Sequence, residues 1–139
     1  MIVMVCVDDK NGMIFNKRRQ SQDKILRADI KELVKNDNLY MNNYSYKLYK
    51  DIDNGNIKVC EDFLNQCNEN DFCLVEDKLL CNYINKINNL IIYSWNRIYP
   101  ADLHFDINLN NNSWELITEF EFQGSSHEKI TKKIYRRIH

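Results

Sequence analysis

Proline and glycine are scarce in this sequence, with one proline and three glycines in 139 residues. Glycine normally supplies the left-handed conformations of tight turns, so we expect asparagine, which tolerates them, to form many of the turns here. The scarcity also argues against a collagen-like or a disordered chain. With 44% hydrophobic and 28% charged residues, the composition is that of a globular protein, and the length predicts a single domain over residues 1–139.

An excess of charge of one sign is also missing, because the net charge is only -1. Nucleic-acid-binding domains usually carry a basic surface, so the net charge does not indicate DNA or RNA as a partner. Long hydrophobic runs are absent too, and the first seven residues lack the basic lead and cleavage site of a signal peptide. We therefore expect a cytoplasmic protein without a membrane partner, while the oligomeric state stays open.

The five cysteines are odd in number and include no CxxC pair: Cys6, Cys60, Cys67, Cys73 and Cys81. Several lie in hydrophobic runs, where a free cysteine behaves as a small core residue. We expect reduced cysteines and neither a disulfide framework nor a structural zinc site. No two histidines have the spacing of metal ligands, so no metal is expected.

Hydrophobic periodicity predicts strands at 2–7, 39–41, 57–59, 72–75 and 90–95, alternating with helices at 21–34, 44–51, 61–67 and 79–87. Residues 114–122 and 129–135 alternate hydrophobic and polar side chains and predict an antiparallel hairpin around Gly124. This order predicts an α/β fold, with a mixed, mostly parallel sheet, flanking helices and a C-terminal antiparallel hairpin.

Short strings along nearly the whole chain have a familiar order and spacing: VMVCVDDKNGMI at 3–14, LRADIK at 26–31, YMNNYS at 40–45, LIIYSW at 90–95, ADLHF at 101–105, WEL at 114–116 and IYRR at 134–137. Together they resemble the dihydrofolate reductase family. The resemblance places residues 3–14 at the first strand and the loop that closes over the substrate, and residues 26–31 at the opening of the first helix. It implies a dihydrofolate reductase-like fold.

The sequence departs from that family where the cofactor would bind. The family has two glycines after the strand that precedes the cofactor helix, and they let backbone amides approach the pyrophosphate of NADPH. Glu76 and Asp77 stand there in this chain, and Asn42 and Asn43 replace the Gly-Arg of the other phosphate site. The segment 51–61 is also too short for the usual strand and its basic loop. We therefore expect no NADPH-dependent reduction and no cofactor.

Asp29 is the first candidate catalytic residue, because it falls within the hydrophobic arc of Ile25, Leu26, Ile30 and Leu33. A carboxylate on such a face is costly unless it is paired or protonated, and it is suited to proton transfer or to holding an amidine-like ligand. The resemblance places Asp29 at the family's substrate-binding carboxylate. The alternative is an aspartate at the stripe edge, half exposed or paired with a lysine.

Three polar groups are further candidates. Residues 18–23 precede a helix and predict an anion-binding site formed by Arg18, Arg19, Gln20, Gln22 and Asp23, or else a solvated loop with a helix cap. Residues 125–128 contain Ser125, Ser126 and His127, of which Ser125 and His127 share a face if the segment is extended, or else they form a polar turn. Asn42 and Tyr44 lie among other tyrosines that either stack on a planar ring or pack a helix.

The leading interpretation is a diverged dihydrofolate reductase-like protein that binds a small molecule or nucleotide in the cleft around Asp29, with His127 as a second candidate catalytic residue. One alternative is a hydrolase acting on nucleotides or RNA, similar to a ribonuclease, through residues 18–23 and 125–128. Another is a structural or interaction protein without a site. Convergence of these two polar segments and Asp29 in one pocket would favour an enzyme, and their dispersal would favour a binding or structural role.

Overall fold

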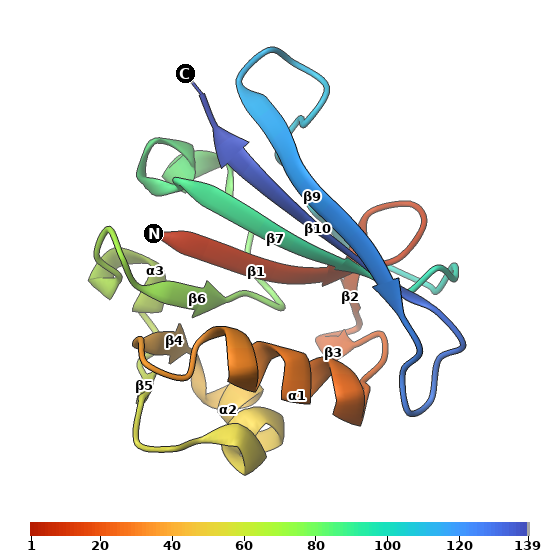
Figure 1. Cartoon of the computed structure of the whole chain (residues 1–139), viewed down its shortest axis with the longest axis horizontal. Coiled ribbons are helices and arrows are strands. Elements are labelled where there is room, and N and C mark those ends of the chain that lie inside the picture. Colours follow the sequence, from red (N-terminus) through yellow and green to blue (C-terminus); the bar gives the residue numbers. More distant parts are fainter. Residues whose placement is uncertain (139) are drawn as a thin grey trace.

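A seven-stranded sheet in the order β5-β4-β6-β1-β7-β10-β9 runs through the middle of the computed structural model, which describes residues 1–138 (Figure 1). Its parallel strands are β1 (Ile2–Val7), β4 (Leu39–Met41), β5 (Ile57–Val59), β6 (Phe72–Leu74) and β7 (Asn89–Ser94). The hairpin of β9 (Trp114–Phe122) and β10 (Ile130–Arg137) completes the sheet, with β10 antiparallel to β7. The predicted mixed, mostly parallel sheet with a C-terminal antiparallel hairpin is confirmed.

Two hydrophobic cores lie on opposite faces of this sheet, as the alternation of side chains along a strand requires. Val3, Val5 and Val7 of β1 belong to one core, and Met4 belongs to the other. The helix α1 (Lys24–Leu33) buries Leu26 in the core that contains Met4. Figure 1 shows α1 and α2 (Asn43–Tyr49) together on that side of the sheet, with the 3-10 turn η1 (Lys50–Ile52) following α2.

The opposite face is covered by α3 (Phe63–Gln66) and by η2 (Cys81–Lys86), a 3-10 helix. The α-helix expected over residues 79–87 is therefore wrong. This segment has no side-chain cap of its own, and the carboxylate of Asp106 accepts hydrogen bonds from the amides of Leu80 and Cys81 instead. Its asparagine, tyrosine and isoleucine residues are also mediocre helix formers.

A second, three-stranded sheet, β3-β2-β8, lies beside the first and consists of β2 (Gly12–Phe15), β3 (Arg18–Arg19) and β8 (Leu103–His104). Asn16 and Lys17 form the turn between β2 and β3 with positive φ angles of 49° and 62°. Asn11 and Asn96 also have positive φ angles, so the expected use of asparagine in turns is confirmed. The strands β3 and β8 are each two residues long and were not predicted, because so short a strand has no recognisable alternation.

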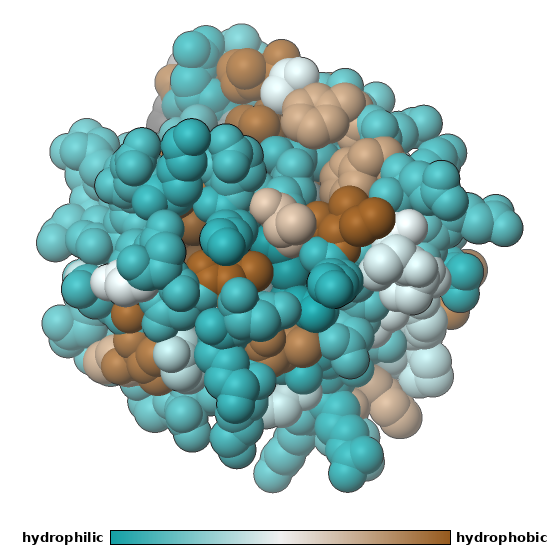
Figure 2. Space-filling model, turned by 60° about the horizontal axis from the view of Figure 1, so that its bottom comes forward, coloured by the Kyte–Doolittle hydropathy of each residue, from teal (hydrophilic) through white to brown (hydrophobic). Residues whose placement is uncertain are grey.

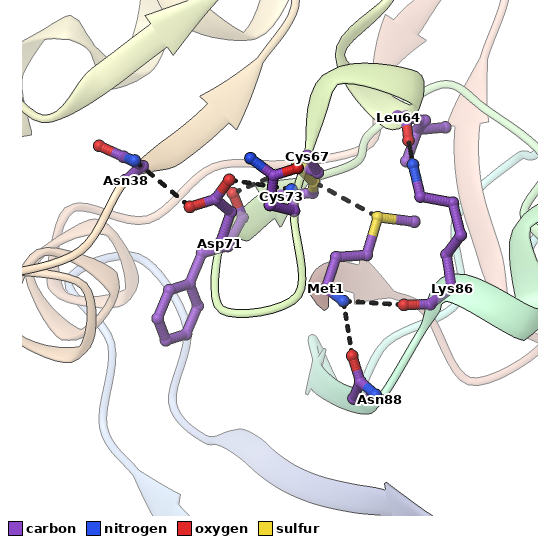
Figure 3. Close-up of a disulfide and its surroundings, with 10 residues drawn as sticks. Met1, Asn38, Leu64, Cys67, Asp71, Cys73, Lys86 and Asn88 are labelled. Atoms are coloured by element: carbon purple, nitrogen blue, oxygen red, sulfur yellow. Dashed lines mark hydrogen bonds between the residues drawn. A yellow bond between two sulfur atoms is a disulfide. The ribbon is translucent and has the colours of Figure 1, made fainter.

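Cys67 and Cys73 form a disulfide, so the expectation that all cysteines are reduced is wrong for this pair (Figure 3). A turn brings the end of α3 back beside β6, and the carboxylate of Asp71 accepts a hydrogen bond from the amide of Asn68 in that turn. The terminal amine of Met1 lies nearby and donates to Lys86 and Asn88: Figure 3 shows both bonds. Cys6, Cys60 and Cys81 are free.

The face that carries α1 and α2 is mostly hydrophilic, with hydrophobic side chains in small separate patches (Figure 2). Ile25 contributes to this exposed surface although the sequence pattern placed it on the buried stripe of α1. Within residues 1–138, no helix has the length and apolar character needed to cross a membrane.

Candidate functional site

The start of α1 is organised by Asp23, whose side chain is almost completely buried. Its Oδ1 caps the helix by accepting hydrogen bonds from the amides of Ile25 and Leu26, as the helix-cap interpretation of residues 18–23 requires. The same carboxylate accepts the amides of Ser125 and Ser126 from the β9–β10 turn. Burial opposes ionisation of Asp23, but hydrogen bonds from His127 and these amides outweigh it and hold its pKa well below the usual value.

His127 follows this turn and is 4% exposed. Its Nδ1 lies 3.0 Å from Asp23 Oδ2, and its Nε2 lies 2.9 Å from Ser21 Oγ. The imidazole ring stacks on Trp95 with the ring centres 4.5 Å apart, and the hydroxyl of Tyr99 lies 3.4 Å from Nε2. The residues from two ends of the chain thus form one hydrogen-bonded chain, Ser21–His127–Asp23.

Gly124 makes this approach possible, because a Cβ atom at this position would overlap the carboxylate of Asp23. The amide of Gly124 donates to the carbonyl of His127 and closes the turn. Ser125 Oγ accepts from the amide of Lys24, and Ser126 Oγ donates to the carbonyl of Gln22. Figure 1 shows the β9–β10 turn beside the start of α1. The turn therefore holds the helix end through both backbone and side-chain hydrogen bonds.

Asp29 lies on the next turn of α1 and is already paired. Its Oδ2 accepts hydrogen bonds from the hydroxyl of Tyr93 at 2.5 Å and from the ammonium of Lys132 at 2.8 Å. The side chain of Lys132 is 6% exposed and that of Asp29 is 28% exposed. Burial, together with the charge of Asp29, raises the pKa of Tyr93 well above its ordinary value. The chain thus neutralises the carboxylate with its own lysine, in line with the salt-bridged alternative.

The loop after β6 holds the two acidic residues of the expected cofactor position. Glu76 accepts two hydrogen bonds from the guanidinium of Arg19 and a third from the hydroxyl of Ser45. Asp77 accepts from the side-chain amide of Asn42, which also caps α2. Both carboxylates are partly buried and have partners within the protein.

Two pockets flank the β2–β3 turn. The larger, about 570 Å³, is lined by Ile14, Asn16, Lys17, Tyr44, Asp77, Asp102 and Leu103. The smaller, about 220 Å³, is lined by Phe15, Asn16, Arg18, Arg19, Gln20, Tyr99 and Pro100. Arg19 stacks its guanidinium over the ring of Tyr44 at 4.4 Å and donates its amide to the hydroxyl of that residue. Tyr44 and Arg19 thus fix the wall between the hairpin and α2.

The buried carboxylate of Asp8 holds together the segments around these pockets through hydrogen bonds. It accepts the amides of Lys10, Gly12 and Tyr99 and the side-chain amide of Gln20. Burial opposes its ionisation, but these hydrogen bonds outweigh burial and lower the pKa of Asp8. Asp8 therefore connects the end of β1 with the hairpin and with the segment that precedes β8.

Most candidate residues fall into two groups, and Gln22 and Asp29 lie outside both. Asp23, Ser125, Ser126 and His127 meet at the start of α1, so the two polar segments converge. Arg18, Arg19, Gln20 and Tyr44 line the pockets at the hairpin, and Asn42 binds Asp77 beside them. Gln22 is exposed and accepts a hydrogen bond from Arg27. Asp29 lines neither hairpin pocket and is bonded to Tyr93 and Lys132.

Sequence reasoning missed the partners Ser21, Tyr93, Tyr99 and Lys132. Each comes from a strand or loop far along the chain from the residue it contacts, for example 106 residues for Ser21 and His127. The one available signal in the sequence was Lys132, a lysine at an inward-facing position of β10, which indicates a buried partner of opposite charge. Among residues 1–138, no group of three or more histidine, cysteine, aspartate or glutamate side chains could hold a metal ion.

Comparison with solved structures identifies a similar protein, a dihydrofolate reductase from Enterococcus faecalis complexed with NADP(H) and RAB-propyl. The TM-score is 0.70 at 9% sequence identity, and the match covers 99% of this chain and 96% of that chain. No protein-family model and no curated protein matches the sequence. At this identity the likeness concerns the fold and not the chemistry. The resemblance seen in the order of short strings is confirmed: the chain has the dihydrofolate reductase-like fold.

Proposed function

We propose that this protein binds a small molecule in the cleft beside the β2–β3 turn and does not use NADPH. The observation that carries the proposal is the loop after β6, where Glu76 and Asp77 stand at the place that the resemblance assigns to the two glycines of the pyrophosphate site. The fold itself, shared with a reductase, leaves the chemistry open.

Charge and geometry both support the exclusion of NADPH. Glu76 engages Arg19 with two hydrogen bonds, so the charge of this arginine is already neutralised. An added pyrophosphate would meet the charge of Asp77 at short range, in a partly buried site where repulsion is weakly screened. The segment after these residues is the 3-10 helix η2 and not an α-helix, so the aligned amides of a long helix N-terminus are missing.

The pocket of about 570 Å³ supports the binding of a different ligand. Ile14, Leu103 and the ring of Tyr44 supply apolar and aromatic surface, and the carboxylates of Asp77 and Asp102 outnumber the one cation of the lining, Lys17. Asp29 is less suited to this task because Lys132 already neutralises it. These features fit a planar ring that carries a cationic amine or amidinium group, with the ring on Tyr44 and the cation near the two aspartates.

A thermal-shift experiment with benzamidine, folate and NADPH tests the proposal. Benzamidine should raise the melting temperature saturably, and NADPH should not. At a benzamidine concentration ten times its dissociation constant, the free energy of unfolding should rise by about 1.4 kcal/mol. Asp77→Asn and Asp102→Asn should each weaken the benzamidine effect. Asp37→Asn, an exposed aspartate remote from the pocket lining, serves as the matched control. Saturable stabilisation by NADPH would overturn the exclusion, and equal benzamidine shifts in all variants would overturn the site.

A further inference from the structure

The hydrogen-bonded chain Ser21–His127–Asp23 has the connectivity of an activated nucleophile. We propose that Ser21 is the nucleophile of a serine hydrolase site that cleaves small carboxylic esters, with His127 as general base and Asp23 as the group that orients it. The Oγ–Nε2 distance of 2.9 Å and the Nδ1–Oδ2 distance of 3.0 Å are both within direct proton-transfer range.

Asp23 is built to hold the imidazole in one tautomer. It is 2% exposed, and its oxygens also accept four backbone amides, so it stays ionised and fixed in place. An ionised carboxylate accepts the proton of His127 Nδ1, which leaves the lone pair of Nε2 facing the hydroxyl of Ser21. Stacking on Trp95 holds the ring plane. A helix cap alone would require neither the imidazole of His127 nor the hydroxyl of Ser21.

Ser21 is half buried and lines a narrow cavity together with Arg19, Gln20 and Trp95. This cavity holds only about 10 Å³ and shares Arg19 and Gln20 with the open pocket of about 220 Å³, so an acyl group has to reach the hydroxyl from that pocket. The size of the pocket favours a short ester over a polypeptide or a polynucleotide. A triad of this kind performs acyl transfer, so the proposed substrate differs from the nucleotide or RNA of the alternative interpretation.

Two donors near Ser21 are available to stabilise the oxyanion of an acyl-transfer reaction. The backbone amide of Gln22, the residue after the nucleophile, donates to no acceptor within residues 1–138. The Nη1 of Arg19 also has no acceptor in that part of the chain, whereas its Nε and Nη2 bind Glu76. Preorganised donors of this type are usually a large source of rate enhancement.

The reaction balances with water as the only co-reactant. Ser21 Oγ attacks the carbonyl carbon of the ester, and its proton passes to His127 Nε2. The tetrahedral intermediate collapses, the bond from carbon to the alcohol oxygen breaks, and the alcohol leaves with that proton. Water then attacks the acyl-serine through the same proton transfer to His127, which releases the carboxylic acid and restores Ser21.

Labelling with a fluorophosphonate probe, followed by intact-mass and peptide mass spectrometry, tests the assignment on the full chain. The probe should modify Ser21, fail to modify Ser21→Ala, and modify His127→Gln at least about 100-fold more slowly. Ser113→Ala, which changes a serine outside the hydrogen-bonded chain, should be labelled like the parent protein. Absence of labelling in the folded parent, or labelling unchanged in Ser21→Ala, overturns the proposal and leaves the network a loop anchor.

A second variant keeps the test decisive if His127→Gln does not fold. In Ser21→Cys, the neighbouring imidazole should generate a thiolate at neutral pH, so iodoacetamide should alkylate position 21 faster at pH 7 than the exposed Cys81. Equal or slower alkylation contradicts the assigned role of His127. Neither readout involves the pocket of about 570 Å³, so failure here and failure of the benzamidine experiment are distinguishable.

Discussion

The pair of Asp29 and Lys132 makes a quantitative prediction, because its two side chains differ in exposure. Replacement Asp29→Asn removes the charge partner of a lysine that is 6% exposed. Removing one member of a buried pair costs about 3–5 kcal/mol, because the remaining charge is left without its partner. The rings of Tyr93 and Phe120 lie within 5.7 Å of the ammonium and reduce the loss.

We therefore expect Asp29→Asn to lower the free energy of unfolding by about 3 kcal/mol, or roughly 10 °C in melting temperature for a chain of this size. Lys132→Met should cost only about 1–2 kcal/mol, since Asp29 keeps water and the hydroxyl of Tyr93. The double variant should lose less than the sum of the two single changes.

Urea denaturation followed by tryptophan fluorescence measures these values, with Asp37→Asn as a control for an exposed aspartate. The reasoning fails if Asp29→Asn costs less than Lys132→Met, because the uncompensated lysine would then not be the expensive partner. Strictly additive effects would likewise show that the two side chains do not interact in solution.

Three further predictions follow from the buried groups. Gly124→Ala should destabilise the protein by about 1–3 kcal/mol and slow fluorophosphonate labelling, because the added methyl group would overlap Asp23. Thermal unfolding and the labelling rate measure the two effects, and an unchanged melting temperature would contradict the prediction. Burial raises the folded-state pKa of Tyr49 and Tyr93 well above 10.0. The unfolded chain therefore loses these protons first, and stability should fall as the pH rises above about 10. In Tyr93→Phe, the urea midpoint should fall less steeply with pH than in the parent protein. The folded-state pKa of Asp23 lies below its usual 3.8, so the stability that this carboxylate contributes is present above about pH 4 and is lost as the pH falls through the folded-state value. In circular dichroism melts, Asp23→Asn should therefore have a lower melting temperature than the parent protein at pH 6, and the difference should shrink as the pH is lowered.

The strands were predictable from the sequence because their signal is local. The alternation along residues 114–122 and the apolar run at residues 2–7 each specify one or two buried faces without reference to other segments. The cap of α1 by Asp23 was predictable for the same reason. Where a distant residue decides the outcome, the sequence pattern failed: Asp106 supports η2 from 26 residues away, and the predicted helix is absent.

The candidate site was predictable in its parts but not in its connections. The polar segments around Asp23 and His127 stood out in composition, yet their direct contact depends on the fold of the whole chain. Asp29 was identified as unusual, but the lysine that neutralises it lies on β10, 103 positions later. The six-residue spacing of Cys67 and Cys73 was visible, while the turn that brings them together was not.

The contact between the β9–β10 turn and the start of α1 also constrains the order of events on the ribosome. Asp23 can cap its own helix once Lys24–Leu33 has been synthesised, but Ser125 and His127 emerge about a hundred residues after Asp23. A nascent chain must therefore hold this carboxylate in a provisional, solvated arrangement until the hairpin arrives. The Ser21–His127–Asp23 chain is consequently among the last features to assemble during biosynthesis.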